Sequence, residues 1–261
     1  MIRKLLLIEK TKLLNYSSFW IIMSLFSVLI VLSFMVAGSL GTLDVNGNSM
    51  NLPQLSIYEF PILWHYLTYI AGFLHYLPAL LIILVVTNDI QYGLWRQNVA
   101  DGLDRKELLW SKVLVITVIS IFATILLVVL GLVYGLSHTH DVDLKLVIES
   151  AEFLVGYFVQ LFAYMVIALL FAVFIKSPAQ AIVYLLVYGI IVERLISLLL
   201  PEVFSFYLPM AAFSGIISNP YMNLMGMEVI NTPFTNILFV SLAWIVVILV
   251  GLYAYIRSQD I

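Results

Sequence analysis

The chain has 261 residues, of which 63 % are apolar and 10 % charged, and its mean hydropathy of +1.09 excludes a soluble enzyme. Twelve Lys and Arg residues against fifteen Asp and Glu residues give a net charge of −3, so no basic field exists to hold nucleic acid as a partner. The absence of cysteine excludes disulfides, thiolate metal sites and cysteine nucleophiles, and the composition indicates a protein whose solvent is membrane lipid.

The first sixteen residues predict an amphipathic helix on the inner membrane surface. Its apolar face also carries one acid, and this face consists of Ile2, Leu5, Leu6, Leu13 and Glu9. Most of the cations of this segment fall on other faces, as in interfacial helices that lie flat on a bilayer. The alternative is a positively charged anchor with no further role.

Six apolar stretches follow, each long enough to cross ~30 Å of hydrocarbon. They cover residues 17–40, 62–87, 113–136, 151–175, 179–200 and 236–256. All should be helices, because lipid offers no hydrogen-bond partner to an open backbone. The sequence therefore predicts an all-α, polytopic membrane protein with six transmembrane helices in one domain, residues 1–261.

Lys and Arg residues in the short connections predict the orientation, because they resist translocation. Ten of the twelve lie in the N-terminal segment, between the second and third stretches, or beside the fourth and sixth. Lys145 is on the opposite side, and Arg194 lies within the fifth stretch. Both termini are therefore expected in the cytoplasm.

The second apolar stretch carries a polar stripe and a proline, Pro78, that predicts a kink. The stripe consists of His65, Tyr69, Gly72 and Tyr76, with His75 on its shoulder. The first four are spaced i, i+4, i+7 and i+11, so they share one helix face. Polar groups at this depth face protein or water, which makes the stripe a candidate lining of a transport pathway. Packing against a neighbouring helix, with neutral histidines, is the alternative.

The connection after this stretch predicts a short helix from Ile90 to Ala100. Tyr92, Trp95 and Val99 fall on one stripe of that helix. The stripe either anchors the segment in the headgroup layer or presses against a soluble partner.

A hard turn and a capped restart follow the short helix. Asp101 and Gly102 should end it, since glycine is the usual residue just past a helix end. Asp104 is the expected N-cap of the next helix, and Glu107 three residues later completes a capping box.

Residues 102–112 resemble a stretch of a known family. They read Gly-Leu-Asp-Arg-Lys-Glu-Leu-Leu-Trp-Ser-Lys. This is similar to the Gly-Leu-Ser-Arg-x-Glu-Leu-Leu-x-Gly-Lys stretch of type-2 ATP-binding cassette (ABC) exporter permeases, which also lies between spans two and three. Gly102, Arg105, Glu107 and Lys112 match that stretch. Asp104 and the serine before Lys112 stand where the family more often has serine and glycine.

The resemblance implies the permease subunit of an ATP-driven exporter in a prokaryotic plasma membrane. Two permeases, identical or homologous, each dock on a cytoplasmic ATPase subunit that holds ATP and Mg. This chain would bind no cofactor and be no enzyme, and it has no G-x-x-x-x-G-K-[ST] phosphate loop. The short helix corresponds to the family's coupling helix. The ATPase-subunit contacts that this implies are Tyr92, Trp95, Arg96, Val99 and Asp101.

The fifth stretch contains two neighbouring charges, Glu193 and Arg194, about fifteen residues or ~22 Å from its inner end. Neighbours on a helix point ~100° apart, so each is expected to pair with another helix or face an aqueous cavity, and both are candidate pathway residues.

The segment 201–235 is apolar, lacks cations and is broken by Pro and Gly. It predicts re-entrant or interfacial helices on the outer face, with an ordinary packed loop as the alternative.

Three functions remain open at this stage. The first is export of an amphipathic peptide, lipid or drug by an ATP-driven complex. The second is an ion-coupled secondary transporter that uses His75, Glu193 and Arg194. The third is a membrane anchor of an ATP-driven surface machine with no substrate of its own. The four histidines form no H-E-x-x-H motif, and no catalytic or metal site is predicted.

Overall fold

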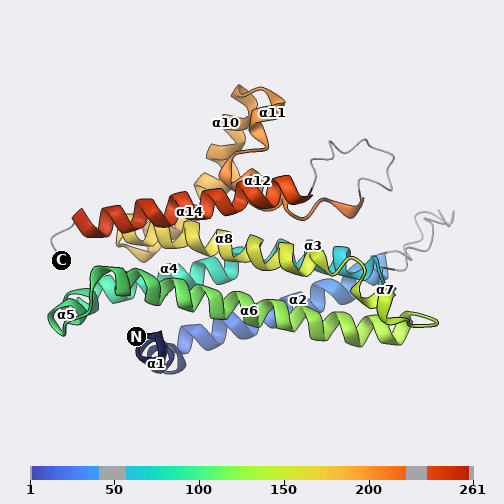
Figure 1. Cartoon of the computed structure of the whole chain (residues 1–261), viewed down its shortest axis with the longest axis horizontal. Coiled ribbons are helices and arrows are strands. Elements are labelled where there is room, and N and C mark those ends of the chain that lie inside the picture. Colours follow the sequence, from blue (N-terminus) through green and yellow to red (C-terminus); the bar gives the residue numbers. More distant parts are fainter. Residues whose placement is uncertain (1, 41–56, 222–233, 259–261) are drawn as a thin grey trace.

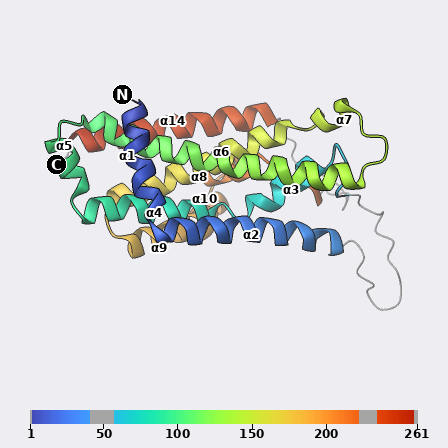
Figure 2. The same cartoon turned by 90° about the horizontal axis from the view of Figure 1, so that it is seen from below.

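The structure, a computed structural model, describes residues 2–40, 57–221 and 234–258, and all secondary structure in these ranges is helical. Most of the long helices run along one common axis (Figure 1). The helix α1 (Ile2–Leu14) and the last turn of α14 (Phe234–Ser258) lie toward the end of the bundle that carries α5 (Leu94–Ala100), and α7 (Leu144–Ile148) lies at the other end (Figures 1 and 2). The cation-rich connection, the first helix and the end of the last helix are therefore on the same side.

The predicted N-terminal helix is present as α1 (Ile2–Leu14), which is followed by α2 (Ser17–Leu40). Figure 2 shows α1 lying across the bundle, whereas α2 runs along it. Trp20 stabilises the turn between α1 and α2, because its indole N–H donates to the Leu14 carbonyl over 3.0 Å. A helix set across the end of a bundle is the arrangement expected of an interfacial segment.

The second predicted span is a bent pair, α3 (Leu63–Gly72) and α4 (Tyr76–Gln91), whose axes differ by 44°. Pro78 explains the bend, because it has no N–H to donate to the carbonyl four residues earlier. That carbonyl belongs to Leu74 and accepts instead from the Leu77 N–H at 3.1 Å. The predicted kink is confirmed, but it breaks the polar stripe, so Tyr76 does not share a helix with His65.

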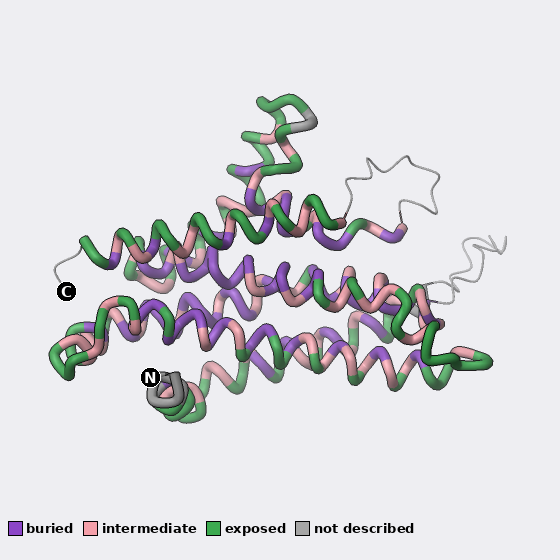
Figure 3. Tube along the Cα trace, viewed as in Figure 1, coloured by how far each residue is buried: buried purple, intermediate pink, exposed green. Residues whose placement is uncertain are grey.

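Two long helices follow, α6 (Arg105–His138) and α8 (Glu152–Ile175). α8 is the centre of the bundle and packs against α3, α4, α6 and α14 (Phe234–Ser258). Buried residues concentrate on α8 and on the helix faces turned toward it, whereas outward faces are exposed (Figure 3). Apolar outward faces are what a helix bundle presents to lipid.

The fifth predicted span is not one straight helix. α9 (Pro178–Val187) passes into a π-helical turn, η1 (Tyr188–Val192), and then into α10 (Glu193–Leu199). α10 and α11 (Glu202–Ser205) project away from the bundle near the middle of its length (Figure 1). We call residues 193–205 the arm. Glu193 and Arg194 therefore lie at the base of the arm, and not on a straight continuation of α9.

The described part of the predicted outer segment returns from the arm to the bundle. α12 (Pro209–Gly215) packs against α8 and α14, and its Met210, Ala212 and Phe213 are buried. The remainder of the segment, from 222 to 233, lies outside the described residues. The described portion of the segment thus consists of short helices separated by turns.

Within the described residues, five helices are long and apolar enough to cross a membrane, and there are six if the bent pair of α3 and α4 forms one span. An all-helical chain with five to six candidate spans supports the prediction of a helical membrane protein.

A glycine contact between α3 and α6 provides a test of this packing. A Cβ added at Gly131 of α6 would lie 2.2 Å from the ring of Trp64, whereas one at Gly251 of α14 would meet nothing within 4 Å. We expect Gly131→Ala to destabilise the protein by ~1–3 kcal/mol through overpacking. Gly251→Ala should be neutral or stabilising by up to ~1 kcal/mol, because alanine is the better helix former. Thermal unfolding of both variants in detergent measures the difference, and equal unfolding temperatures would contradict the packing of Trp64 on α6.

Candidate functional site

A buried cluster of charges joins three helices at the end of the bundle that carries the termini. Lys112 Nζ of α6 lies 2.7 Å from Glu9 Oε1 of α1 and 2.5 Å from Asp89 Oδ2 of α4. Lys12 of α1 adds a second cation, 3.3 Å from the same Asp89 oxygen. The cluster is therefore electrically balanced, with two acids and two lysines.

Burial makes this cluster a fixed joint. The side chains of Lys112, Glu9 and Asp89 are 3 %, 6 % and 8 % exposed. Separating them would leave charges without partners in a low-dielectric interior, which costs far more than breaking a surface pair. Ser111 reinforces the joint, since its Oγ donates to Glu9 Oε1 over 3.0 Å. The cluster thus ties α1 to the end of α4 and the start of α6, on the side of the membrane predicted to be cytoplasmic.

The connection between α4 and α6 differs from the predicted single helix. Gly93 adopts φ +69°, in the left-handed region, and separates α4 from α5. The short helix thus begins at Leu94, not at Ile90. Tyr92 lies at the end of α4 and is 79 % exposed, whereas Trp95 is 7 % exposed and packs in the core. The predicted stripe of Tyr92, Trp95 and Val99 is therefore not one surface, because the left-handed glycine rotates the two segments.

The turn after α5 forms as the sequence predicts. The Gly102 N–H donates to the Val99 carbonyl and the Leu103 N–H to the Asn98 carbonyl, both over 3.0 Å. This is the Schellman pattern of helix termination, and Gly102 adopts the positive φ, +89°, that it requires. Asp104 then takes an extended conformation, and its N–H donates to Glu107 Oε2 over 3.0 Å in the predicted capping box.

Each matched residue of the 102–112 segment has a structural task here. Gly102 supplies the turn, Asp104 and Glu107 cap α6, and Lys112 holds the charge cluster. Arg105 Nη1 donates to the Arg257 carbonyl at the end of α14, where a cation is favourable to the helix dipole.

We call residues 92–104, which include α5, the tip. Its exposed residues are Tyr92, Arg96, Gln97, Ala100, Asp101, Gly102 and Asp104. Of the predicted ATPase contacts, Tyr92, Arg96 and Asp101 thus remain accessible, Val99 is partly accessible and Trp95 is not.

The polar stripe of α3 mostly packs against protein. The His65 ring stacks on Phe153 with centroids 4.0 Å apart, and its Nε2 lies 2.8 Å from the Ser218 carbonyl oxygen. Gly72 faces Gln160 of α8, and a Cβ there would come within 3.3 Å of the amide oxygen. Tyr69 is half-buried near Tyr221. The contacts described for His65, Tyr69 and Gly72 are contacts between packed segments of the chain.

His75 and Tyr76, at the bend between α3 and α4, are placed differently from the stripe. His75 is buried, its Nδ1 bonds the Gly72 carbonyl, and its ring stacks on Tyr164 of α8. Tyr76 reaches the π-helical turn, where its hydroxyl oxygen would lie 2.7 Å from a Cβ at Gly189. A Cβ at Gly189 would therefore require the end of the Tyr76 side chain to shift.

Glu193 finds a partner other than a cation. It is 4 % exposed, and its two oxygens accept the backbone N–H groups of Met210 and Ala211 at 3.0 and 2.6 Å. These groups belong to the first turn of α12, whose unsatisfied N–H groups favour an anion. The expectation that Glu193 pairs with another segment holds, and the pairing fastens α12 to the base of the arm.

A polar pocket of 540 Å³ opens between the bundle and the arm. It lies on the boundary of α4, α8, η1, α10 and α12. Its lining residues are Tyr76, Tyr164, Gly189, Ile190, Glu193, Arg194, Ser197, Ser205, Phe206, Met210, Ala211 and Ser214. Three of the predicted pathway residues, Tyr76, Glu193 and Arg194, are brought together here.

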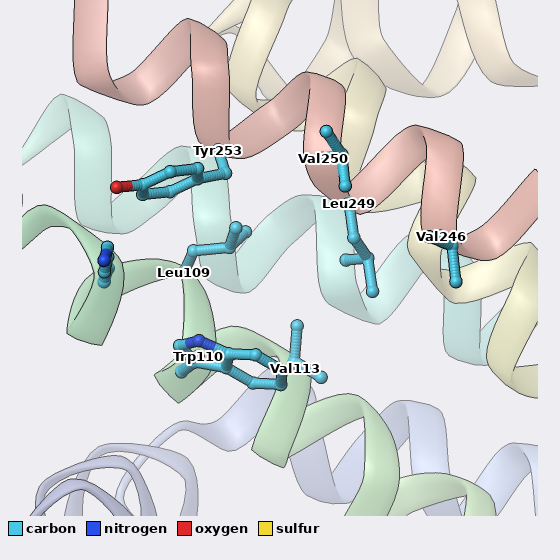
Figure 4. Close-up of a pocket in the computed structure, with 8 residues that line it drawn as sticks. Leu109, Trp110, Val113, Val246, Leu249, Val250 and Tyr253 are labelled. Carbon is cyan, nitrogen blue, oxygen red and sulfur yellow. The ribbon is translucent and has the colours of Figure 1, made fainter.

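A second, apolar groove of 410 Å³ separates α6 from α14 (Figure 4). Leu109, Trp110 and Val113 face it from α6, and Leu249 and Tyr253 are among those that face it from α14. Only one lining residue is charged, Lys106, whose Nζ lies 5.5 Å from the Tyr253 ring centroid. A groove of this chemistry suits lipid chains.

Several residues of these sites were not predicted as site residues. Glu9 could have been assigned a partner, because an acid on the apolar face of a helix needs one, and Asp89 directly follows the second apolar stretch. Tyr164, Gly189 and Ser197 carry no such signal. Their place in the polar pocket depends on how the π-helical turn directs α10.

The chain was compared with protein families and with curated proteins. No family model matches it, and no curated protein matches it.

The charge cluster predicts unequal effects of its two lysines. Lys112→Met would leave Glu9 and Asp89 buried without their main cation, so we expect a loss of ~3–5 kcal/mol in stability. Lys12→Met removes a cation whose side chain is 28 % exposed and should cost only ~0–1 kcal/mol. Thermal or denaturant unfolding in detergent compares them. A combined Glu9→Gln, Asp89→Asn, Lys112→Met variant should recover part of the loss, and no recovery would show that packing, not charge, explains the Lys112 effect.

Proposed function

We propose that this chain is the membrane-spanning permease subunit of an ATP-driven type-2 ABC exporter, in which a separate cytoplasmic ATPase subunit holds ATP and Mg. The observation that carries the proposal is the construction of the 102–112 segment. Its matched residues build a terminated short helix, a capped restart and a buried anchor, all at the end of the bundle where the cations gather.

The short helix α5 is suited to transmit a push. The Schellman turn ends α5 and the capping box begins α6, so hydrogen bonds hold the short connection between the two helices. A force on α5 therefore reaches α6 without unwinding either helix end. The charge cluster then passes the force to α4 and α1. We place the ATPase contact on the exposed residues Tyr92, Arg96 and Asp101, and not on the buried Trp95.

A second permease subunit, the same or homologous, would cover the arm. Leu198, Leu199 and Phe204 of the arm are 81 %, 86 % and 62 % exposed in the single chain. Apolar surface of this kind is covered either by lipid or by a partner helix. The exporter would work by alternating access, with α4 linking the ATPase contact to the polar pocket. It would lie in a prokaryotic plasma membrane, with both termini in the cytoplasm.

Variants at the tip test the coupling. We expect Tyr92→Asp with Arg96→Glu to lower recovery of the ABC-type ATPase encoded nearest to this gene about tenfold in co-purification, since losing a central contact costs ~1–2 kcal/mol. Lys145→Glu, an exposed charge reversal near the opposite end, is the matched control and should leave recovery unchanged.

Three outcomes of that experiment would redirect the proposal. Unchanged recovery with unchanged ATP-dependent transport would remove the contact from α5. Transport of the substrate by the purified chain without any ATPase would support the ion-coupled carrier. Stable ATPase binding with no transport of any amphipathic compound would support the anchor of a surface machine.

The orientation has its own test, which the absence of native cysteine makes direct. Ser137→Cys lies at the end of α6 away from the termini, and Ser258→Cys lies at the end of α14. A membrane-impermeant maleimide should label Ser137→Cys in intact cells and Ser258→Cys only after permeabilisation. The reverse pattern would invert the topology and place α5 outside, where no ATPase could reach it.

A further inference from the structure

Arg194 is a cation without a counter-ion among the described residues. No ion pair or hydrogen bond of its side chain occurs there, and the residue is exposed on the arm. It follows Pro178, the first residue of α9, by sixteen positions, which is at most ~24 Å of helix at 1.5 Å per residue. In the membrane orientation proposed above, that distance leaves it inside the ~30 Å hydrocarbon layer. A guanidinium at this depth requires an anion or water.

The neighbouring acid, Glu193, is directed toward α12 and forms no ion pair with Arg194. Each of its oxygens accepts a backbone N–H of α12, and the residue is 4 % exposed. The positive end of α12 compensates its charge. Both residues line the pocket, but Glu193 is buried whereas Arg194 is exposed. Among the described residues, the pocket thus offers one positive charge that has no ion pair.

The rest of the pocket supplies hydroxyl groups and room. Tyr76, Tyr164, Ser197 and Ser214 contribute hydroxyls to the lining, and the volume of 540 Å³ exceeds what a phosphate group needs. Ser197 and Ser214 donate to backbone carbonyls, at 2.7 and 3.1 Å, and their oxygens retain lone pairs for water. The Tyr76 hydroxyl, next to Gly189, lines the same pocket as Arg194 and is a further hydrogen-bond donor for an anion.

The surface around the pocket is strongly apolar. Leu195, Leu198 and Leu199 of α10 are 56 %, 81 % and 86 % exposed and follow Arg194 directly. A planar guanidinium with an adjacent apolar strip matches an anionic phosphate group attached to an acyl chain.

We propose that this pocket binds a phosphate group of net negative charge through Arg194, with the apolar arm receiving the chain of an amphipathic carrier. The inference rests on the proposed function, because it names the substrate class of the pathway formed by Tyr76, Glu193 and Arg194. A headgroup held at this depth is in transit across the bilayer. The exported substrate is then an anionic phosphate-bearing amphipath, and neutral or cationic compounds are disfavoured.

Binding to the purified chain without any ATPase tests this directly. Native mass spectrometry in detergent would be used to titrate phosphatidylglycerol and phosphatidylcholine with identical acyl chains. We expect the wild type to prefer phosphatidylglycerol and Arg194→Gln to bind it about tenfold more weakly, the loss of one charge-assisted contact. Arg194→Lys should keep most of the preference. Arg257→Gln, an equal charge change at the end of α14, should leave binding within about twofold, as expected of an exposed charge away from the site.

Inorganic phosphate distinguishes the two sources of the anion. If free phosphate displaces phosphatidylglycerol from the wild type, the site recognises the phosphate group alone. If it does not, the acyl chain is part of the ligand, and both results support the anion site. Equal affinities of wild type and Arg194→Gln, or of the two lipids, would overturn it. Thermal unfolding of Arg194→Gln confirms that the variant is folded.

The same data separate this inference from the proposed function. Preference for phosphatidylglycerol that depends on Arg194, in a chain that recruits no ATPase, would overturn the exporter assignment alone. ATPase coupling with no lipid preference would overturn the phosphate site alone.

Discussion

A buried lysine fixes the arrangement of three helices. Lys112 reaches Glu9 from α1 and Asp89 from α4, and all three side chains are almost fully buried. An ion buried this deeply is tolerated only with partners at hydrogen-bond distance. α1, α4 and α6 therefore share one relative position, and α1 cannot drift along the membrane surface without leaving charges unpaired.

The helix α4 begins at the polar pocket and ends at the charge cluster. Asp89 lies near the end of α4 and Tyr76 at its start, thirteen residues apart, or ~20 Å along the helix. α4 is packed against α8, so it moves as a unit. In the exporter proposed above, α4 would connect a displacement at α5 to Tyr76 and the polar pocket, as alternating access requires.

The pocket depends on an irregularity in the helix. The π-helical turn at 188–192 directs α10 away from the bundle, and Gly189 within it accommodates the Tyr76 hydroxyl. π-Helical turns of this kind occur frequently at functional sites. Because Glu193 then caps α12, the segment that returns from the arm is held at the pocket by two backbone hydrogen bonds.

Local patterns in the sequence determined the membrane class, the six apolar stretches, the kink at Pro78, the turn at Gly102 and the Asp104–Glu107 cap. Each of these depends on hydrophobic run length or on interactions within about four residues, which a sequence displays directly. Only the tertiary structure decided that Trp95 is buried, that His65 packs on Phe153, and that the fifth span bends into an arm. It alone also brought Lys112 to Glu9, 103 residues away. Such pairings depend on how helices distant in sequence pack, and hydrophobic periodicity does not record which helix a face will meet.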